Sequence, residues 1–235
     1  MRPAFSFVRC CADTFENGMT LPMISDLSRS LVLIRHGQSE DNEQDLFSGL
    51  RDPALTARGE EEARAAGREL ARLGFRFTHA FTSVLTRAGR TMELILAELG
   101  QSDLPVVRNS ALNERDYGAL AGLNKTQARE RFGPERVRIW RKSYDAVPQG
   151  GESLAMTAAR VWPFYARAIA PAVRAGGCVL LVGHGNALRS MLMRLDGIDP
   201  EAIEDVNIGT AQILVYTLAE DGERLVKATE LSGTR

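Results

Sequence analysis

The chain has 235 residues, of which 44% are hydrophobic and 25% charged, as is ordinary for a soluble globular protein with a core of its own. Its 29 basic and 30 acidic residues give a net charge of −1, which argues against a nucleic-acid-binding or membrane-surface protein, because such proteins usually have a basic excess. No apolar run approaches the roughly 20 residues of a membrane span. The three cysteines form no evident disulfide framework, which fits a reducing compartment such as the cytoplasm.

The amino-terminal part of the chain, residues 1–30, shows no hydrophobic periodicity, and we expect it to be a poorly ordered extension. The first convincing element is Leu31–Ile34, four aliphatic residues that predict a short strand buried on both faces of a sheet. It ends in Arg-His-Gly at residues 35–37, and in open α/β sheets ligands bind at this end of the strands. A lone Arg-His-Gly is a weak signal, because short motifs match by chance and a core strand followed by a turn would explain it.

Helices and strands alternate along the rest of the chain. After a polar loop over residues 39–53, the pattern predicts a helix from Thr56 to about Gly74, a strand over 78–83, a helix over 84–99 and a short strand over 106–107. Residues 113–142 carry charges and single aromatic residues without a long apolar run. We expect residues 125–142 to form one or two helices of a small cap over the site.

The carboxyl-terminal part predicts a further helix, strand, helix and strand. In order, these are a turn at 148–151, a helix over 152–175, a buried strand over 178–183, a helix containing Leu188 and Leu192, and a strand over 212–218, after which the C-terminus trails off. Pro163 and Pro171 should bend or divide the first of these helices. The alternation implies an α/β three-layer sandwich with a mainly parallel central sheet, helices on both faces and the small helical cap.

Two buried strands of this sheet each end in His-Gly, which places His36 and His184 at the same edge if the strands are parallel. Arg87 lies in the first turn of a helix, where the helix dipole disfavours a cation, so an anion-binding role would explain its position. Two imidazoles and the guanidiniums of Arg35 and Arg87 would repel one another unless they bound a dianion. Phosphate suits them, because arginine binds it bidentately and a histidine nitrogen can be a nucleophile.

Other phosphate and metal motifs are missing from the sequence. It has no glycine-rich Walker loop and no Rossmann fingerprint. The histidines are not spaced as ligands on one element, so we expect no metal. The expected chemistry is phosphoryl transfer by positioning and charge stabilisation.

Longer motifs support one family. They are Leu33–Ser39 with Asn42, Phe47–Gly49, Thr82–Leu85 with Arg87 and Ala88, Leu112–Gly118, Gly122–Lys125, Trp140–Lys142, Gly151–Leu154 and Gly183–Asn186 with Leu188 and Arg189. On these motifs the chain, from about residue 30 to the C-terminus, resembles the histidine phosphatase superfamily. Within it, the chain resembles the cofactor-dependent phosphoglycerate mutases, which require 2,3-bisphosphoglycerate. Arg-His-Gly alone indicates the superfamily, whereas Leu-Asn-Glu-Arg-x-Tyr-Gly with Gly-Leu-Asn-Lys and Trp-Arg-Lys is more specific to the mutases.

The resemblance implies roles for individual residues in a single mutase-like domain over residues 31–235. His36 would accept the phosphoryl group as a phosphohistidine, while Arg35, Arg87 and His184 would hold the group in transfer. Glu114 would be the general acid and base for the substrate hydroxyl, a role that suits a carboxylate. The substrate pocket would contain Arg35, Asn42, Ser48, Gly49, Arg87, Glu114, Arg115, Tyr117, Lys125, Arg141, Lys142, Gly185 and Asn186.

The resemblance also implies a cofactor, substrates and partners. The cofactor 2,3-bisphosphoglycerate would prime His36, without a metal. The reaction would interconvert 3-phosphoglycerate and 2-phosphoglycerate in glycolysis and gluconeogenesis, in a cytoplasmic homodimer or homotetramer. No nucleic-acid or membrane partner is expected.

Several positions depart from the family pattern. Asp41 and Leu50 stand where many relatives have tryptophan, Ser48 replaces a threonine, and Lys142 replaces an arginine, which keeps the charge but loses the planar fork. The chain is also short between Val147 and Gly151, so less of it is available to cover the site. Two alternatives stay open: a phosphatase of the same superfamily that acts on a small phosphate ester, and a catalytically inactive relative that binds a partner. The inactive relative predicts a broken set of catalytic residues, whereas Arg35, His36, Arg87, Glu114 and His184 are all present.

Overall fold

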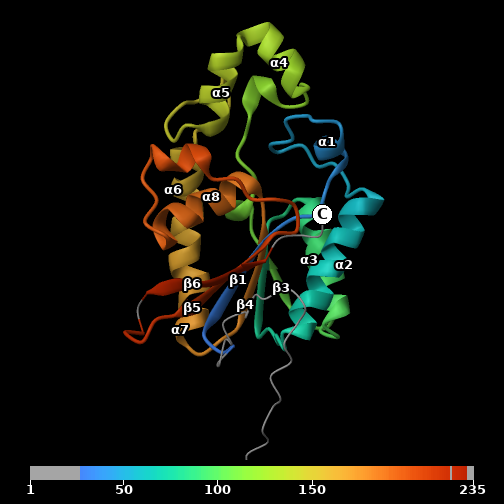
Figure 1. Ribbon diagram of the computed structural model, residues 1–235, viewed down its shortest axis with the longest axis vertical. Coiled ribbons are helices and arrows are strands. Elements are labelled where there is room, and N and C mark those ends of the chain that lie inside the picture. Colours follow the sequence, from blue (N-terminus) through green and yellow to red (C-terminus); the bar gives the residue numbers. More distant parts are fainter. Residues whose placement is uncertain (1–26, 223, 232–235) are drawn as a thin grey trace, which may run out of the picture.

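A six-stranded sheet in the order β3-β2-β4-β1-β5-β6 forms the centre of the computed structural model, which describes residues 27–222 and 224–231 (Figure 1). Most of the segment expected to be poorly ordered therefore lies outside the described residues. The strands are β1 Ser30–Arg35, β2 His79–Thr82, β3 Val106–Arg108, β4 Val179–Gly183, β5 Ile213–Leu218 and β6 Leu225–Leu231. Strands β1, β2, β3 and β4 pair in parallel, whereas β5 pairs antiparallel with β1, and β6 antiparallel with β5. The prediction of a mainly parallel sheet is confirmed.

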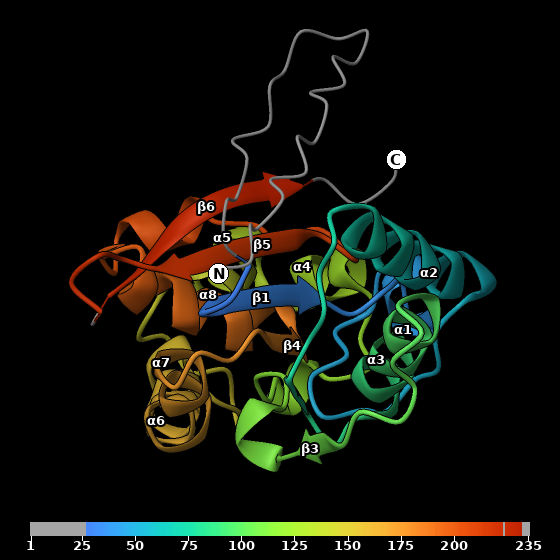
Figure 2. The same cartoon turned by 90° about the horizontal axis from the view of Figure 1, so that it is seen from below.

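Helices cover both faces of the sheet, as the alternation of elements predicts (Figure 2). On one face lie α2 Ala57–Arg72 and α3 Thr86–Glu98. On the other lie α6 Leu154–Phe164, a π-helical stretch Tyr165–Ile169, α7 Ala170–Arg174 and α8 Gly185–Leu195. Strand β1 is buried on both sides, because Val32 and Ile34 pack into one apolar cluster and Leu31 and Leu33 into the other.

The long helix expected over residues 152–175 is divided near its prolines. Helix α6 ends one residue after Pro163, and α7 begins one residue before Pro171. Proline lacks an amide hydrogen and its ring clashes with the preceding turn, so a regular α-helix does not run through both positions. The five-residue π-helical stretch joins the two pieces.

A small helical cap stands beyond the carboxyl ends of β1 and β4 (Figure 1). It contains α4 Lys125–Phe132 and α5 Pro134–Lys142, which confirms two cap helices. A third apolar cluster holds the cap together, with Phe47, Leu120 and Val137 among its buried members. The remaining short helices are α1 Glu40–Glu43, within the predicted polar loop, and the 3-10 turns Ser110–Leu112, Gly118–Leu120 and Ala202–Asp205.

The expectation that the C-terminus trails off after residue 218 is wrong. Residues Leu225–Leu231 form β6, which pairs antiparallel with β5 and extends the sheet by one edge strand. Many side chains of this edge strand remain in contact with solvent: Leu225 is buried, whereas Val226 and Lys227 are exposed. The segment therefore lacks the continuous apolar run by which the central strands were predicted. In the described part of the chain, no helix has the length and apolar character needed to cross a membrane.

Candidate active site

The pairing of β1 with β4 brings the two His-Gly sequences together. The strands are parallel, with Arg35 opposite Gly183, and the backbone N–H of His36 donates to the Gly183 carbonyl at 3.0 Å. The imidazole rings of His36 and His184 consequently lie 5.1 Å apart between centroids, at an angle of 59°. The expectation that both histidines emerge at one edge of the sheet is confirmed.

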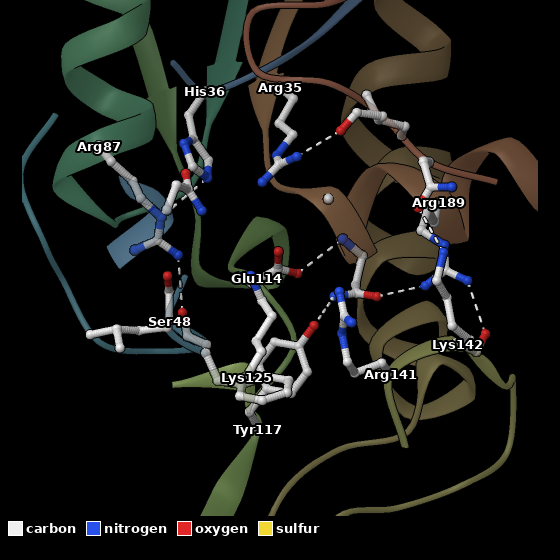
Figure 3. Close-up of a pocket in the computed structure, with 18 of the residues that line it drawn as sticks. Arg35, His36, Ser48, Arg87, Glu114, Tyr117, Lys125, Arg141, Lys142 and Arg189 are labelled. Carbon is white, nitrogen blue, oxygen red and sulfur yellow. Dashed lines mark hydrogen bonds between the residues drawn. The ribbon is translucent and has the colours of Figure 1, made fainter. Parts of the chain in front are cut away.

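A pocket of about 220 Å³ lies at this edge, between the strand ends and the cap (Figure 3). Six cationic side chains line it against a single carboxylate, that of Glu114. The cations are Arg35, Arg87, Lys125, Arg141, Lys142 and Arg189. This excess of positive charge, contributed by β1, α3, α4, α5 and α8, makes the pocket suitable for a ligand with more than one anionic group.

His36 is held as a neutral ring with one unprotonated nitrogen. Its Nδ1–H donates to the Gly37 carbonyl at 2.7 Å, which leaves the lone pair on Nε2. Arg87 Nε donates to that lone pair at 3.3 Å. Burial, and then the charges of Arg87 and Arg35, lower the pKa of His36 well below its usual value. The neutral form with a bare Nε2 is the form that can attack phosphorus.

His184 is fully buried beside His36. Its Nε2 lies 2.7 Å from the hydroxyl of Ser83, and its Nδ1 has no hydrogen-bond partner. Burial is the largest cause that lowers its pKa well below the usual value, and Arg87 and His36 lower it further. Burial and the neighbouring cations therefore favour the neutral form of both histidines at neutral pH.

Arg87 connects the strand ends to the loop after α1. It is fully buried in the first turn of α3, and its two Nη groups donate to the carbonyls of Arg51 at 2.7 Å and Gly49 at 3.0 Å. Gly49 has a φ of +53°, a conformation that glycine adopts most easily. Burial lowers the pKa of Arg87, and guanidinium remains charged at any physiological pH. The predicted place of this cation at the sheet edge is confirmed.

Arg35 and Glu114 face each other across the pocket (Figure 3). Arg35 Nη1 donates to the Ile208 carbonyl at 2.7 Å, whereas its buried Nε has no partner. Glu114 Oε1 accepts the backbone N–H of Arg115 at 2.8 Å and that of Asn186 at 3.0 Å. Two backbone donors fix this carboxylate, which is well placed to exchange a proton with a ligand in the pocket.

The end of the pocket away from the histidines is formed by the cap and α8. Lys142 Nζ donates to Asn207 Oδ1 at 2.7 Å, and the Asn186 side-chain amide donates to the Tyr117 hydroxyl at 3.1 Å. Burial, and then the charges of Arg189 and Arg141, lower the pKa of Lys142. This crowding of cations favours the binding of an anion there.

Most residues predicted to contact substrate line this pocket, but two do not. Arg115 is fully buried behind the wall, where its guanidinium stacks over the Tyr117 ring at 4.7 Å and donates to the Arg141 carbonyl at 3.1 Å. His184 is fully buried with its ring beside that of His36, and it is not one of the lining residues. The predicted residues that do line it are Arg35, His36, Asn42, Ser48, Gly49, Arg87, Glu114, Tyr117, Lys125, Arg141, Lys142, Gly185 and Asn186.

The sequence-based set misses one cation and one loop. Arg189 lines the pocket and donates to Asn186 Oδ1, to the Lys142 carbonyl and to the Ile203 carbonyl at 2.9, 2.9 and 2.6 Å. Residues 206–208 also line it, together with Leu46 and Phe47. Arg189 belongs to a motif that supports the family, and this was the one available signal. Within residues 27–222 and 224–231, no group of three or more His, Cys, Asp or Glu side chains could hold a metal ion.

Comparison with known proteins identifies the class. A model of the histidine phosphatase superfamily (branch 1) matches residues 31–230. The solved structure of a mycobacterial glucosyl-3-phosphoglycerate phosphatase matches with a TM-score of 0.73 and 27% identity, over 85% of this chain and 96% of that one. The chain therefore belongs to the histidine phosphatase superfamily, as its motifs and the pair of histidines at the strand ends predict.

Within the superfamily, the chain is similar over most of its length to curated 2,3-bisphosphoglycerate-dependent phosphoglycerate mutases. The one from Brucella anthropi is 53% identical over 195 residues, which cover 83% of this chain and 95% of that protein. The one from Methylobacterium sp. (strain 4-46) is 56% identical over 195 residues, with 83% and 94% covered. The resemblance inferred from the motifs is thus confirmed.

Proposed function

We propose that this protein interconverts 3-phosphoglycerate and 2-phosphoglycerate through a phosphorylated His36. The observation that carries the proposal is the neutral His36 with a bare Nε2 at one end of a pocket whose other end is also cationic. A phosphoglycerate has a phosphate at one position and a carboxylate at another, so both ends of the pocket have a group to bind. The similarity to curated mutases supports the same reaction.

In the proposed reaction, His36 Nε2 attacks the phosphorus of a phosphate ester, so that an N–P bond forms as the ester P–O bond breaks. Arg35, Arg87 and His184 donate hydrogen bonds to the phosphoryl oxygens and stabilise the charge that develops on them. Glu114 gives a proton to the departing oxygen. In the return step it takes the proton from the hydroxyl that attacks the phosphohistidine.

The residues of the pocket fit 2,3-bisphosphoglycerate. Two buried donors at the strand ends, Arg35 Nε and His184 Nδ1, have no partner in the protein and are suited to phosphoryl oxygens. Arg141 and Lys142 form the cationic end opposite them. When bound, this compound supplies the phosphoryl group that primes His36.

A phosphatase acting on a small phosphate ester is the second candidate. Among the described residues, none in the short segment 147–151 lines the pocket, because Gln149 instead bonds through its carbonyl to the backbone N–H of Ala119 at 2.8 Å. That segment does not cover the site, and a mutase must keep water away from its phosphohistidine. The similarity to the solved glucosyl-3-phosphoglycerate phosphatase also supports the phosphatase candidate. The specific cap motifs shared with the mutases favour the first candidate.

A coupled assay separates the two functions. Conversion of 3-phosphoglycerate to 2-phosphoglycerate is measured with and without added 2,3-bisphosphoglycerate, and inorganic phosphate is measured in the same samples. We expect fast isomerisation that depends on 2,3-bisphosphoglycerate and slow phosphate release, with both lost in His36→Gln. Fast phosphate release without isomerisation would establish the phosphatase instead.

The proposal also includes the setting of the enzyme. We place it in the cytoplasm as one catalytic domain over residues 31–235. We infer from the resemblance that it is a homodimer or homotetramer, which sedimentation or light scattering would measure.

A further inference from the structure

Ser83 is a buried hydroxyl at the sheet edge that the proposed reaction does not use. It follows the last residue of β2 and is fully buried, and it does not line the pocket. Its Oγ accepts the backbone N–H of Leu85 at 3.1 Å and lies 2.7 Å from His184 Nε2. Ser83 therefore reaches the site only through His184.

The hydrogen atoms of this contact can be assigned by counting donors and acceptors. A serine hydroxyl has one hydrogen to donate and two lone pairs that accept. The Leu85 amide uses one lone pair of Ser83. If His184 Nε2 carried a hydrogen, it would take the other lone pair and leave the buried hydroxyl hydrogen without an acceptor. If Nε2 is unprotonated, it accepts that hydrogen, and every hydrogen-bonding group of Ser83 Oγ is satisfied. This tautomer leaves only Nδ1–H of His184 without a partner in the protein, whereas the other leaves both the hydroxyl hydrogen and the Nδ1 lone pair without one.

We propose that Ser83 is a positioning residue that holds His184 in its Nδ1–H tautomer by donating its hydroxyl hydrogen to Nε2. The inference rests on the proposed function, because it matters for phosphoryl transfer. Nδ1 of His184 is buried and has no partner in the protein, so in this tautomer it presents a free N–H. That N–H is the donor that a phosphoryl oxygen needs.

The same tautomer gives the two neighbouring histidines opposite roles. In His36, the Gly37 carbonyl binds Nδ1–H, and the bare Nε2 is left for the reaction. In His184, the Ser83 hydroxyl binds Nε2, and Nδ1–H is left for the ligand. One ring thus offers a lone pair to phosphorus and the other a hydrogen to oxygen.

The charges around His184 make its tautomer decisive. Arg35, Arg87 and Arg160 act on the ring from separate elements and, together with His36 and burial, disfavour a second proton on it. A neutral imidazole has one N–H only. Whether His184 is a donor or an acceptor toward the ligand therefore depends on which nitrogen Ser83 binds.

Nitrogen-15 NMR of the histidine rings tests this directly. The sequence has three histidines, so protein labelled at histidine gives three ring systems, and His79→Gln and His36→Gln assign the third to His184. In the wild-type protein we expect a protonated Nδ1 and a bare Nε2 for His184. A protonated Nε2 would overturn the inference, and this reading needs no Ser83 variant.

The second arm compares Ser83→Ala with Thr82→Val. Thr82 is the preceding buried residue and donates its hydroxyl to the Val182 carbonyl at 2.8 Å, so its replacement removes a similar hydrogen bond away from His184. We expect Ser83→Ala to lose the single Nδ1–H tautomer and to phosphorylate His36 on the order of 10 to 100 times more slowly, as when other tautomer-fixing partners of histidine are removed. Thr82→Val should keep both the tautomer and the rate.

The outcomes separate this inference from the proposed function. A Ser83→Ala protein with the wild-type tautomer and rate would overturn the role of Ser83. The tautomer of wild-type His184 is read without substrate. A wild-type enzyme that lacks isomerase activity but holds Nδ1–H would therefore contradict the proposed function while supporting the inference about Ser83.

Discussion

Arg87 Nε lies 3.3 Å from His36 Nε2, so the cation at the start of α3 donates a hydrogen bond to the atom that we propose attacks phosphorus. The contact exists because α3 begins directly beyond β2, whose neighbour β4 pairs with β1. When Nε2 bonds to phosphorus, its lone pair is no longer available. The guanidinium must then donate to a phosphoryl oxygen instead, where it stabilises the charge of the transferred group.

Replacing Glu114 by glutamine should stop proton transfer without disturbing the fold. Glutamine keeps an oxygen that can accept the two backbone N–H groups now bonded to Glu114 Oε1, but it cannot take a proton. We expect isomerisation to fall by a factor on the order of 10² to 10⁴. Stopped-flow or quenched-flow kinetics measure the rate, and thermal unfolding checks that stability is retained. Wild-type turnover in Glu114→Gln would exclude this carboxylate as the general acid and base.

Replacing Arg189 by methionine should weaken substrate binding. Its guanidinium joins Asn186 to the carbonyls of Lys142 and Ile203, and thereby joins α8 to the cap. Each hydrogen bond from a charged group contributes about 1.5 to 3 kcal/mol, so we expect Arg189→Met to raise the KM for 3-phosphoglycerate at least about tenfold. Steady-state kinetics of the isomerisation measure it.

The matched control is Arg194→Met on the same helix. Arg194 stacks over the Trp162 ring at 4.7 Å and does not line the pocket. We expect its KM to stay near that of the wild type. Equal effects of the two substitutions would mean that loss of charge, rather than the connection to Asn186 and the cap, explains the result.

Much of the site could be predicted because it follows from regular structure. Leu31–Ile34 is a continuous apolar run, and residues 178–183 are another, so the sequence predicts both as buried parallel strands. Parallel pairing then places His36 and His184 together without further information. The first turn of α3 follows β2, which brings Arg87 to the same edge.

The parts that were missed depend on contacts between distant segments. Arg189 lies in a helix whose apolar residues predict only a buried face. Its place at the pocket depends on hydrogen bonds to the carbonyls of Lys142 and Ile203, which are distant in the sequence. Residues 206–208 belong to an irregular segment with no periodicity, so no local pattern places them beside Arg35. Strand β6 is an edge strand with one neighbour, and its weak apolar pattern does not distinguish it from a tail.

Gly37 should be essential for packing α2 against the segment that follows His36. A Cβ at this position would lie 2.2 Å from the carbonyl oxygen of Gly59, which belongs to the helix backbone and cannot move away easily. We expect Gly37→Ala to lower the free energy of unfolding by about 1 to 3 kcal/mol or more, as overpacking does. Urea denaturation measures it.

Gly185→Ala is the control for this effect. A Cβ at Gly185 would lie 3.5 Å from Glu114 Oε2, an ordinary contact distance, and Gly185 begins a helix, where alanine is favourable. We expect its free energy of unfolding to stay close to that of the wild type. A Gly37→Ala protein as stable as Gly185→Ala would contradict the close approach of α2 to this segment.

The buried neutral histidines should make stability depend on pH. Burial and the charge of Arg87 lower the pKa of both His36 and His184, so the unfolded chain takes up protons near pH 6.5 that the folded chain does not. The free energy of unfolding is therefore unaffected by these histidines well above pH 6.5. As the pH falls below 6.5, it decreases by about 1.4 kcal/mol per pH unit for each histidine. Urea unfolding between about pH 7.5 and 5.5 measures the slope. His36→Gln should remove about half of it, and a wild-type stability that is flat over this range would mean that these rings are protonated in the folded protein.

Labelling the protein with 2,3-bisphosphoglycerate that contains radioactive phosphorus tests whether His36 carries the phosphoryl group. We expect one acid-labile phosphate per chain on His36, which addition of 3-phosphoglycerate removes, with no label in His36→Gln and full label in His79→Gln. Label that persists in His36→Gln, or a wild-type protein that acquires none, would contradict it.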